Sequence, residues 1–335
     1  MSTRHSRFIL AGVLAALLLP ATAGAQWRLT DGLAGASGST VGPDGALYVT
    51  EGLAGQITRV DPWTGDQIDF GTNLPQGGEL IPGLGGPADV AFVDGVAYVL
   101  VNLVNGCFGG PATMGIYEMQ APDHFEVLAD LGTFNNDNPP ATPFDLACGV
   151  PYGIEAFRGG LLVTDGHLNR VLWVSLNGDI HIFESFGNIV PTGLEVHGNR
   201  VYVAQAGPSP HDPADGKIVS IDARSGAVAD VGSGAPLLVD VEFGVGRTLY
   251  ALAQGEWCPP GETPPLCGKF PGAPAEPNGG LLVEVNADGS FTEVAGGLNL
   301  PTSMEFIGNS AYIVNLLGEI WVVDDVSQPP FGRKH

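Results

Sequence analysis

Residues 40–51 read Thr-Val-Gly-Pro-Asp-Gly-Ala-Leu-Tyr-Val-Thr-Glu, which is the end of one strand, a tight turn and a second apolar strand. An Asp-Gly turn between apolar runs is typical of a β-hairpin. The same unit recurs along the chain, with first strands at 37–41, 88–92, 152–156, 192–196, 239–243 and 302–306. Each unit continues into a third strand and, after turns such as Asn177-Gly178, into a fourth. Six copies at a spacing of about 50 residues predict an all-β fold, a six-bladed β-propeller with four antiparallel strands per blade, rather than a sandwich.

The two ends of this repeat array are expected to meet. The sixth unit stops after its third strand, at Asp324, so one strand is missing there. We expect residues 27–31 to supply that strand and close the ring, because closure removes the free edges that an open array would expose. The prediction is therefore one propeller domain over residues 26–326, followed by a C-terminal tail at 327–335.

Residues 1–25 have the three parts of a secretory signal peptide. A basic start with Arg4 and Arg7 precedes an apolar run over residues 8–19 and the small residues Ala23-Gly24-Ala25. The apolar run is too short to span a bilayer, although an uncleaved membrane anchor is the alternative. We therefore expect a secreted or periplasmic protein.

The chain is strongly acidic, with 36 Asp and Glu residues against 13 Lys and Arg and a net charge of −23. Such a surface cannot neutralise a row of phosphates, and anionic lipids repel it. We expect no nucleic acid and no membrane among its partners, and we expect a monomer.

The long connections predict where function lies. Residues 71–86 and 132–149 lie between units, and residues 103–114, 206–215 and 255–279 join second to third strands. In an up-and-down blade these two kinds of junction emerge on the same face, which we call the elaborated face. Long loops on a rigid scaffold often carry binding sites. We expect a small molecule, a glycan or a protein to bind there; the alternative is that the loops only cap the disc.

All four cysteines fall in these long connections. For an exported protein we predict two disulfides, Cys107 with Cys148 and Cys258 with Cys267, out of three connectivities. A zinc site would need paired Cys or His residues at short spacing, and the sequence has no C-x-x-C or H-E-x-x-H motif.

Four first strands carry a glutamate at the same place, whereas the other two units have Thr40 and Ala91 there: the glutamates are Glu155, Glu195, Glu242 and Glu305. First strands line the central tunnel of a propeller, so these carboxylates could converge and hold Ca²⁺ or Mg²⁺. The alternative is that each is solvated by tunnel water or bonds a backbone amide of the neighbouring blade. No cofactor is certain from the sequence.

A second polar set ends the second strand of every unit: Glu51, Asn102, Asp165, Gln205, Gln254 and Asn315. One oxygen-bearing side chain per blade at the mouth of the elaborated face is what a polar ligand would need, although strands leaving a core show the same pattern. His167 stands near Asp165 and could be a general base oriented by that acid, or an ordinary surface histidine.

Three segments carry a resemblance to known proteins. Residues 40–51, Ile57-Thr-Arg-Val-Asp-Pro-Trp-Thr-Gly65 and Gly86-Pro-Ala-Asp-Val-Ala-Phe92 resemble the exported propeller proteins of the ScyD/ScyE family, within the NHL and gluconolactonase-like propellers. The resemblance implies the fold and export, and no catalytic residues. In the gluconolactonase propellers Glu, Asn and Asp hold a central metal, but the equivalent positions after the first-strand prolines are here Ala88, Tyr152, Thr192 and Thr302.

Three hypotheses for function follow from these patterns. The first is an exported propeller that binds a ligand on its elaborated face. The second is a metal-dependent lactonase or lyase that uses the tunnel carboxylates. The third is a structural interaction module. The sequence has no G-x-S-x-G, P-loop, G-x-G-x-x-G or EF-hand motif, so it lacks the usual residues of serine hydrolases, nucleotide-binding proteins and simple calcium sites.

Overall fold

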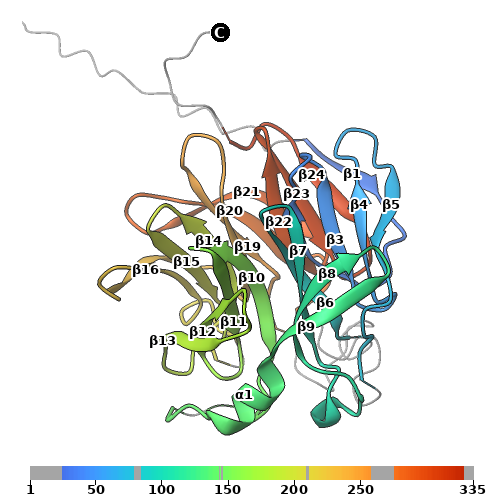
Figure 1. Cartoon of the computed structure of the whole chain (residues 1–335). Coiled ribbons are helices and arrows are strands. Elements are labelled where there is room, and N and C mark those ends of the chain that lie inside the picture. The colour runs from blue at the N-terminus through green and yellow to red at the C-terminus, as the bar shows by residue number, and fades with distance from the viewer. Residues whose placement is uncertain are drawn as a thin grey trace, which may run out of the picture.

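The computed structural model describes residues 25–78, 84–142, 144, 146–208, 211–257 and 275–327. These residues form six four-stranded antiparallel sheets arranged as the blades of a propeller (Figure 1). The strands of the first three blades are β2 (Ala36–Val41), β3 (Leu47–Glu51), β4 (Gln56–Val60) and β5 (Gln67–Gly71); β6 (Gly86–Val93), β7 (Val96–Asn102), β8 (Gly115–Ala121) and β9 (His124–Asp130); and β10 (Pro151–Phe157), β11 (Gly160–Asp165), β12 (Arg170–Ser175) and β13 (Ile180–Ser185).

The second half of the chain repeats this order. Its blades contain β14 (Pro191–His197), β15 (Arg200–Gln205), β16 (Lys217–Asp222) and β17 (Val228–Ser233); β18 (Leu238–Phe243), β19 (Leu249–Ala253), β20 (Gly280–Val285) and β21 (Phe291–Leu298); and β22 (Pro301–Ile307), β23 (Ser310–Asn315), β24 (Ile320–Val323) and β1 (Gln26–Thr30). The predicted six-bladed propeller is therefore confirmed. No helix in the described part of the chain is long and apolar enough to cross a membrane.

The core consists of apolar layers between neighbouring blades. Alternate residues of each strand face one neighbour or the other, and a separate buried cluster fills each of the six interfaces. Between the first two blades, for example, the ring of Tyr48 meets that of Phe92 edge to face at a centroid distance of 4.9 Å. Because every blade is packed on both sides, the ring is rigid and its axis has a fixed shape.

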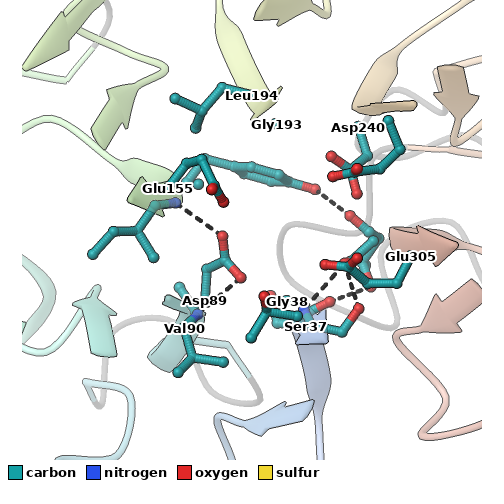
Figure 2. Close-up of a pocket in the computed structure, with 18 residues that line it drawn as sticks. Ser37, Gly38, Asp89, Val90, Glu155, Gly193, Leu194, Asp240 and Glu305 are labelled. Atoms are coloured by element: carbon teal, nitrogen blue, oxygen red, sulfur yellow. Dashed lines mark hydrogen bonds between the residues drawn. The ribbon is translucent and has the colours of Figure 1, made fainter. Parts of the chain in front are cut away.

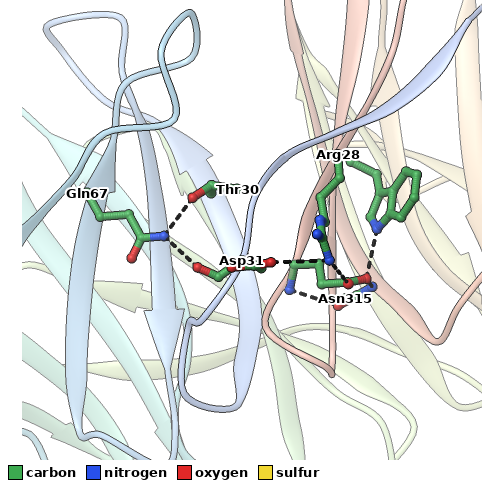
Figure 3. A network of polar contacts seen from close by, with 7 residues as sticks. Arg28, Thr30, Asp31, Gln67 and Asn315 are labelled. Atoms are coloured by element: carbon green, nitrogen blue, oxygen red, sulfur yellow. Dashed lines mark hydrogen bonds and ion pairs between the residues drawn. The ribbon is translucent and has the colours of Figure 1, made fainter.

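The N-terminal strand completes the last blade, as predicted, with bounds one residue earlier than expected. β1 pairs antiparallel with β24, with Gln26 opposite Val323. Side chains support this closure, because Arg28 pairs with Glu319 at 2.9 Å and with Asp31 at 3.2 Å. Figure 3 shows Arg28 and Asp31 beside Thr30 and Gln67. On the other side, Gln67 of the first blade donates to the Thr30 hydroxyl at 2.8 Å, so the closing strand is held by both neighbours.

The connection between β9 and β10 contains a helix that the sequence reasoning did not predict. Helix α1 (Leu131–Asp137) begins where the Asp130 carboxylate accepts a hydrogen bond from the Thr133 amide at 2.8 Å. A short 3-10 helix, η1 (Gly106–Phe108), lies in the connection between β7 and β8. The predicted Cys107–Cys148 disulfide is present and joins these two connections. Cys258 and Cys267, residues 1–24 of the predicted signal peptide and nearly all of the predicted tail lie outside the described residues.

Removal of residues 26–30 should open the ring. The last blade would lose a strand whose backbone hydrogen bonds contribute about 1 kcal/mol each, so we expect a loss of about 3 to 5 kcal/mol in the free energy of unfolding. Chemical denaturation followed by circular dichroism measures this loss, and light scattering detects aggregation through the exposed edge of β24. A chain that begins at residue 26 is the control. A deletion variant that unfolds like this control would contradict closure by β1.

Candidate functional site

The first strand of each blade, which lies nearest the axis and which we call the inner strand, is irregular near its start. The inner strands are β2, β6, β10, β14, β18 and β22. The pairing register shifts in all six, for example between Pro151 and Ile154 in β10 and between Pro301 and Ser303 in β22. A bulge bends a strand and turns a side chain away from the face that simple alternation would give it. As a result, Tyr152, which lies within the irregular segment of β10, and Glu155, which follows it, both border the tunnel.

The blades are linked around the axis by side chains that sequence reasoning did not single out. The Asp89 carboxylate of β6 accepts a hydrogen bond from the Ile154 amide of the next blade at 2.9 Å. The Asp240 carboxylate of β18 accepts one from the Met304 amide at 2.8 Å. Hydrogen bonds of this kind satisfy amides that the bulges leave unpaired. The sequence did offer a signal, because Asp stands in these units where three other units have Gly.

Two of those glycines make room for the aspartates. A Cβ atom at Gly38 would lie 2.3 Å from an oxygen of Asp89, and one at Gly193 would lie 2.2 Å from an oxygen of Asp240. Neither distance is compatible with a side chain, so each Gly and the Asp of the following blade form a complementary pair. Space at the axis is therefore divided between neighbouring blades.

Below these bulges the carboxylates gather around a small cavity, which we call the tunnel chamber (Figure 2). Its volume is about 30 Å³, which is room for about two water molecules. Five carboxylates border it: Asp89, Glu155, Asp240, Glu242 and Glu305. Glu195 is near enough to repel Glu155 and Glu242. The four predicted glutamates are thus brought to one axis, together with two aspartates.

These carboxylates are difficult to ionise. Burial, followed by repulsion from Glu195, raises the pKa of Glu155 to about 8. Burial also raises the pKa of Glu195 and that of Asp240 to about 7. The pKa values of Glu242 and Glu305 lie well above the ordinary range for the same two reasons. The four glutamates are half-buried. Burial and mutual repulsion thus favour the protonated forms of these carboxyl groups.

Among the described residues, no group of three or more His, Cys, Asp or Glu side chains has the geometry to hold a metal ion. Asp89 and Asp240 each accept a hydrogen bond from a backbone amide of the neighbouring blade. This is the role that the sequence suggested for the glutamates as an alternative to metal binding. Binding of Ca²⁺ or Mg²⁺ by Glu155, Glu195, Glu242 and Glu305 stays a prediction.

Tyr152 divides the tunnel. It belongs to the third blade, and its hydroxyl donates to the Thr302 carbonyl of the sixth blade, on the other side of the axis, at 3.2 Å. The Tyr152 side chain therefore reaches across the tunnel, from the third blade to the sixth. It borders the tunnel chamber on one side and a much larger cavity on the other. Tyr152 is therefore the floor of the larger cavity.

The larger cavity, which we call the mouth cavity, has a volume of about 560 Å³. Both kinds of long connection contribute to its wall, as expected for the elaborated face. The wall is mainly apolar, with Leu84, Leu103, Val150, Val190, Leu237, Val239, Trp257 and Leu316. Ligand cavities of small molecules typically measure about 300 to 1,000 Å³ and have such walls with a few polar groups. The mouth cavity matches that description.

Three of the predicted binding residues border the mouth cavity: Asn102, Gln254 and His167. Asn102 and Gln254 also hold the next blade, because they donate to the carbonyls of Pro151 at 2.8 Å and Pro301 at 3.1 Å. The polar set at the ends of the second strands therefore contributes to the cavity in two blades only.

The other members of that set are buried away from the cavity. Glu51 accepts hydrogen bonds from the Ala34 amide and the Thr58 hydroxyl. Asn315 accepts from the amide of Glu319 at 3.0 Å. Gln205 is 1% exposed, and its Oε1 atom has no hydrogen-bond partner among the described residues. Glu51 and Asn315 thus hold turns and strand ends in place, which was the alternative interpretation of the pattern.

The carboxylate of Asp165 is also fully engaged in hydrogen bonds within the protein. Its carboxylate accepts hydrogen bonds from the Asn135 side chain at 2.7 Å, the Val150 amide at 3.0 Å and the Leu168 amide at 3.2 Å. Asn135 belongs to α1 and also accepts from Arg170 at 2.7 Å. Asp165 thus fixes α1 against the third blade. A role of His167 as a general base oriented by Asp165 stays a prediction.

Sequence reasoning missed two residues with large rings in the wall of the mouth cavity. His211 and Trp257 border it, with their rings edge to face at a centroid distance of 6.0 Å. The Nδ1 atom of His211 lies 2.7 Å from the Gly207 carbonyl, and since a carbonyl only accepts, this nitrogen carries the proton. Apolar residues in Pro- and Gly-rich loops show no periodic pattern, so nothing in the sequence separates wall residues from ordinary loop residues.

Comparisons with known proteins support the fold. No protein-family profile and no curated protein match the chain. Among solved structures, virginiamycin B lyase from Staphylococcus aureus is 16% identical with a TM-score of 0.53, over 89% of this chain and 97% of that one. A gluconolactonase from Xanthomonas campestris is 11% identical with a TM-score of 0.58, over 89% and 88%. A chain of the nidogen/laminin complex is 13% identical with a TM-score of 0.53, over 81% and 84%. These identities show a shared propeller fold, which does not by itself determine function.

The tunnel carboxylates should make the protein less stable as the pH rises. A carboxyl group whose pKa is higher in the folded state keeps a proton that the unfolded chain releases, so the free energy of unfolding falls between the two pKa values. For Glu155 this window extends from about pH 4.5 to about pH 8. We expect Glu155→Gln to raise the free energy of unfolding at pH 8 by about 1 to 3 kcal/mol, with little change at pH 5. Thermal and chemical denaturation at both pH values measure the difference.

Glu293→Gln is the control, because Glu293 is exposed on β21. Equal responses of the two variants to pH would contradict the raised pKa of Glu155.

The same thermal scans in chelator, sodium and calcium test the prediction that the tunnel glutamates bind a metal ion. A calcium-specific rise in melting temperature in the wild type that Glu242→Gln abolishes would support it, and identical responses to sodium and calcium at matched ionic strength would refute it.

Replacement of Cys107 and Cys148 by serine should destabilise the wall of the mouth cavity. The two cysteines are 41 residues apart, and a bridge over such a loop contributes about 2 to 4 kcal/mol. Urea denaturation of the double variant measures the loss, and thiol titration of the wild type should find no free sulfhydryl from this pair. Unchanged stability would show that the bridge does not restrain the unfolded chain.

Proposed function

We propose that this protein is an exported β-propeller that binds a small, largely apolar molecule in the mouth cavity of its elaborated face, in keeping with its resemblance to the ScyD/ScyE family. The observation that carries the proposal is the mouth cavity itself, with a volume of about 560 Å³ and a mainly apolar wall. A ligand that fills such a cavity removes apolar surface from water, and each square ångström contributes about 25 cal/mol.

The shape of the site favours a small molecule over the other expected ligands. A protein partner needs an extended surface of about 800 Å² on each side rather than a hollow. A glycan needs many hydrogen-bonding groups, whereas most side chains around the mouth cavity are aliphatic or aromatic. The few polar groups, such as those of Asn102 and Gln254, would orient a ligand rather than solvate it.

The wall is also held in place before any ligand arrives. The Cys107–Cys148 bridge joins the two connections that supply Leu103 and Val150. The hydrogen bonds of Asn102 and Asp165 fix the same region to the blades. A cavity that is formed in advance costs little conformational entropy when it is filled.

The alternative, a metal-dependent lactonase or lyase, depends on the tunnel carboxylates. None of the five that border the tunnel chamber borders the mouth cavity, because Tyr152 lies between the two cavities. The calcium scans described above test the metal site that this alternative needs. No observation of the mouth cavity favours catalysis over binding.

A neutral hydrophobic dye tests the proposal. We expect phenylnaphthylamine to bind with a rise in fluorescence and a single saturable site. Leu316→Trp should weaken this binding at least tenfold, because the larger side chain fills part of the mouth cavity that Leu316 borders. Leu317→Trp is the matched control, since Leu317 is the next residue but is 38% exposed and does not border the cavity. Absence of saturable binding, or equal effects of both variants, would contradict the proposal.

A further inference from the structure

We propose that Tyr152 determines the charge of the ligand: it screens the mouth cavity from the tunnel carboxylates, so the site takes a neutral molecule and discriminates against amines and acids. This inference rests on the proposed function, because it concerns the ligand of the same cavity. It makes Tyr152 a specificity-determining residue of the floor rather than one of many wall residues.

The geometry of the floor carries the inference. The Tyr152 ring borders both cavities, and only three other residues do so: Ser37, Ala88 and Thr302. These three side chains are small, and the hydroxyl of Thr302 is already donated to the Ser37 carbonyl at 2.7 Å. Among the residues that the structure describes, the Tyr152 ring is therefore the one bulky group between the cavities. Its hydroxyl is fixed on the opposite blade by the Thr302 carbonyl, at 3.2 Å.

The chemistry differs sharply across this floor. Below it lie five carboxylates from four inner strands, and only β2 and β14 contribute no acid to the chamber wall. Above it, no Asp, Glu, Lys or Arg borders the mouth cavity in the part of the chain that the structure describes. The titratable side chains there are Tyr152, His167 and His211. Burial raises the pKa of the Tyr152 phenol, so it stays a neutral hydrogen-bond donor.

A charged ligand is penalised in such a cavity. An ammonium group would leave water without meeting an opposite charge among the described residues of the wall, and burial of an unpaired charge is costly. A carboxylate would suffer the same loss and would also be repelled by a protein with a net charge of −23. A neutral molecule loses little solvation and gains the full benefit of the apolar wall.

Removal of the Tyr152 ring would reverse the preference of the site for a neutral ligand over a cationic one. With a small side chain at position 152, the two cavities would join and an ammonium group could reach Glu155, Asp240 and Glu305. Charges that pair in a poorly solvated space attract each other strongly. These acids are difficult to ionise on their own, but an approaching cation would lower their pKa values and favour the ionised forms that attract it.

Three probes that share one ring system test the inference: naphthylmethanol, naphthylmethylamine and naphthoic acid. Binding is measured by isothermal titration calorimetry at pH 8. For the wild type we expect the alcohol to bind at least tenfold more tightly than the amine and the acid. In Tyr152→Ala the amine should gain at least tenfold relative to the alcohol. Tyr152→Phe keeps the ring and should keep the wild-type order.

A second substitution shows whether the carboxylates cause the change. Glu305→Gln should remove most of the gain for the amine in the Tyr152→Ala background and should leave all three affinities unchanged in the wild-type background. Should Tyr152→Ala fail to fold, the wild-type order and the effect of Glu305→Gln on it still decide the matter. Tight binding of the amine to the wild type that Glu305→Gln weakens would overturn the inference.

The outcomes separate the inference from the function on which it rests. Saturable binding of all three probes with similar affinity, in wild type and Tyr152→Ala alike, would refute the role of Tyr152 and leave a binding cavity. Absence of binding by every probe to every variant would refute the proposed function, and the inference with it.

Discussion

Six inner strands converge on one axis, and the space between them is too narrow for every strand to carry a full side chain there. The rest of the structure depends on how this space is divided. Where Asp89 and Asp240 project toward the axis, the preceding blades have Gly38 and Gly193. Where Tyr152 crosses the tunnel, the residues beside it are Ser37, Ala88 and Thr302. A substitution in one inner strand therefore changes the packing of the neighbouring strands, so the side chains of all six strands at the axis pack as one unit.

Much of the fold could be predicted because it follows from local patterns. Strand alternation, Asp-Gly turns and the recurrence of the unit identify six blades, and the missing strand of the last unit leads to β1. The pairing of Cys107 with Cys148 followed from the position of both residues on one face. Helix α1 was missed because a seven-residue helix in a long connection shows too few turns for a periodic signal.

The candidate site was predictable only in part, for a geometric reason. The four tunnel glutamates were found because they stand at equivalent places in a regular strand. Tyr152 was not found, because the bulge after Pro151 turns toward the tunnel a side chain that strict alternation would place elsewhere. The strand-end set, from Glu51 to Asn315, looked like a ligand ring but mostly serves the protein's own backbone amides and side chains. A sequence shows which side chains can accept hydrogen bonds, and only the fold shows which donors reach them first.

The pairing of β1 with β24 has a consequence in time. It joins the first described strand to the last, with Gln26 opposite Val323, so this pairing spans nearly the whole described chain. Contacts between residues so far apart in sequence form slowly, because a long stretch of chain must be ordered before they are gained. During synthesis the first five blades are complete before β24, the partner of β1, has been made. The strand β1 is thus made before the other described strands and pairs after them. Until it pairs, the first five blades form an open arc, and the blades at its two ends each have one uncovered face.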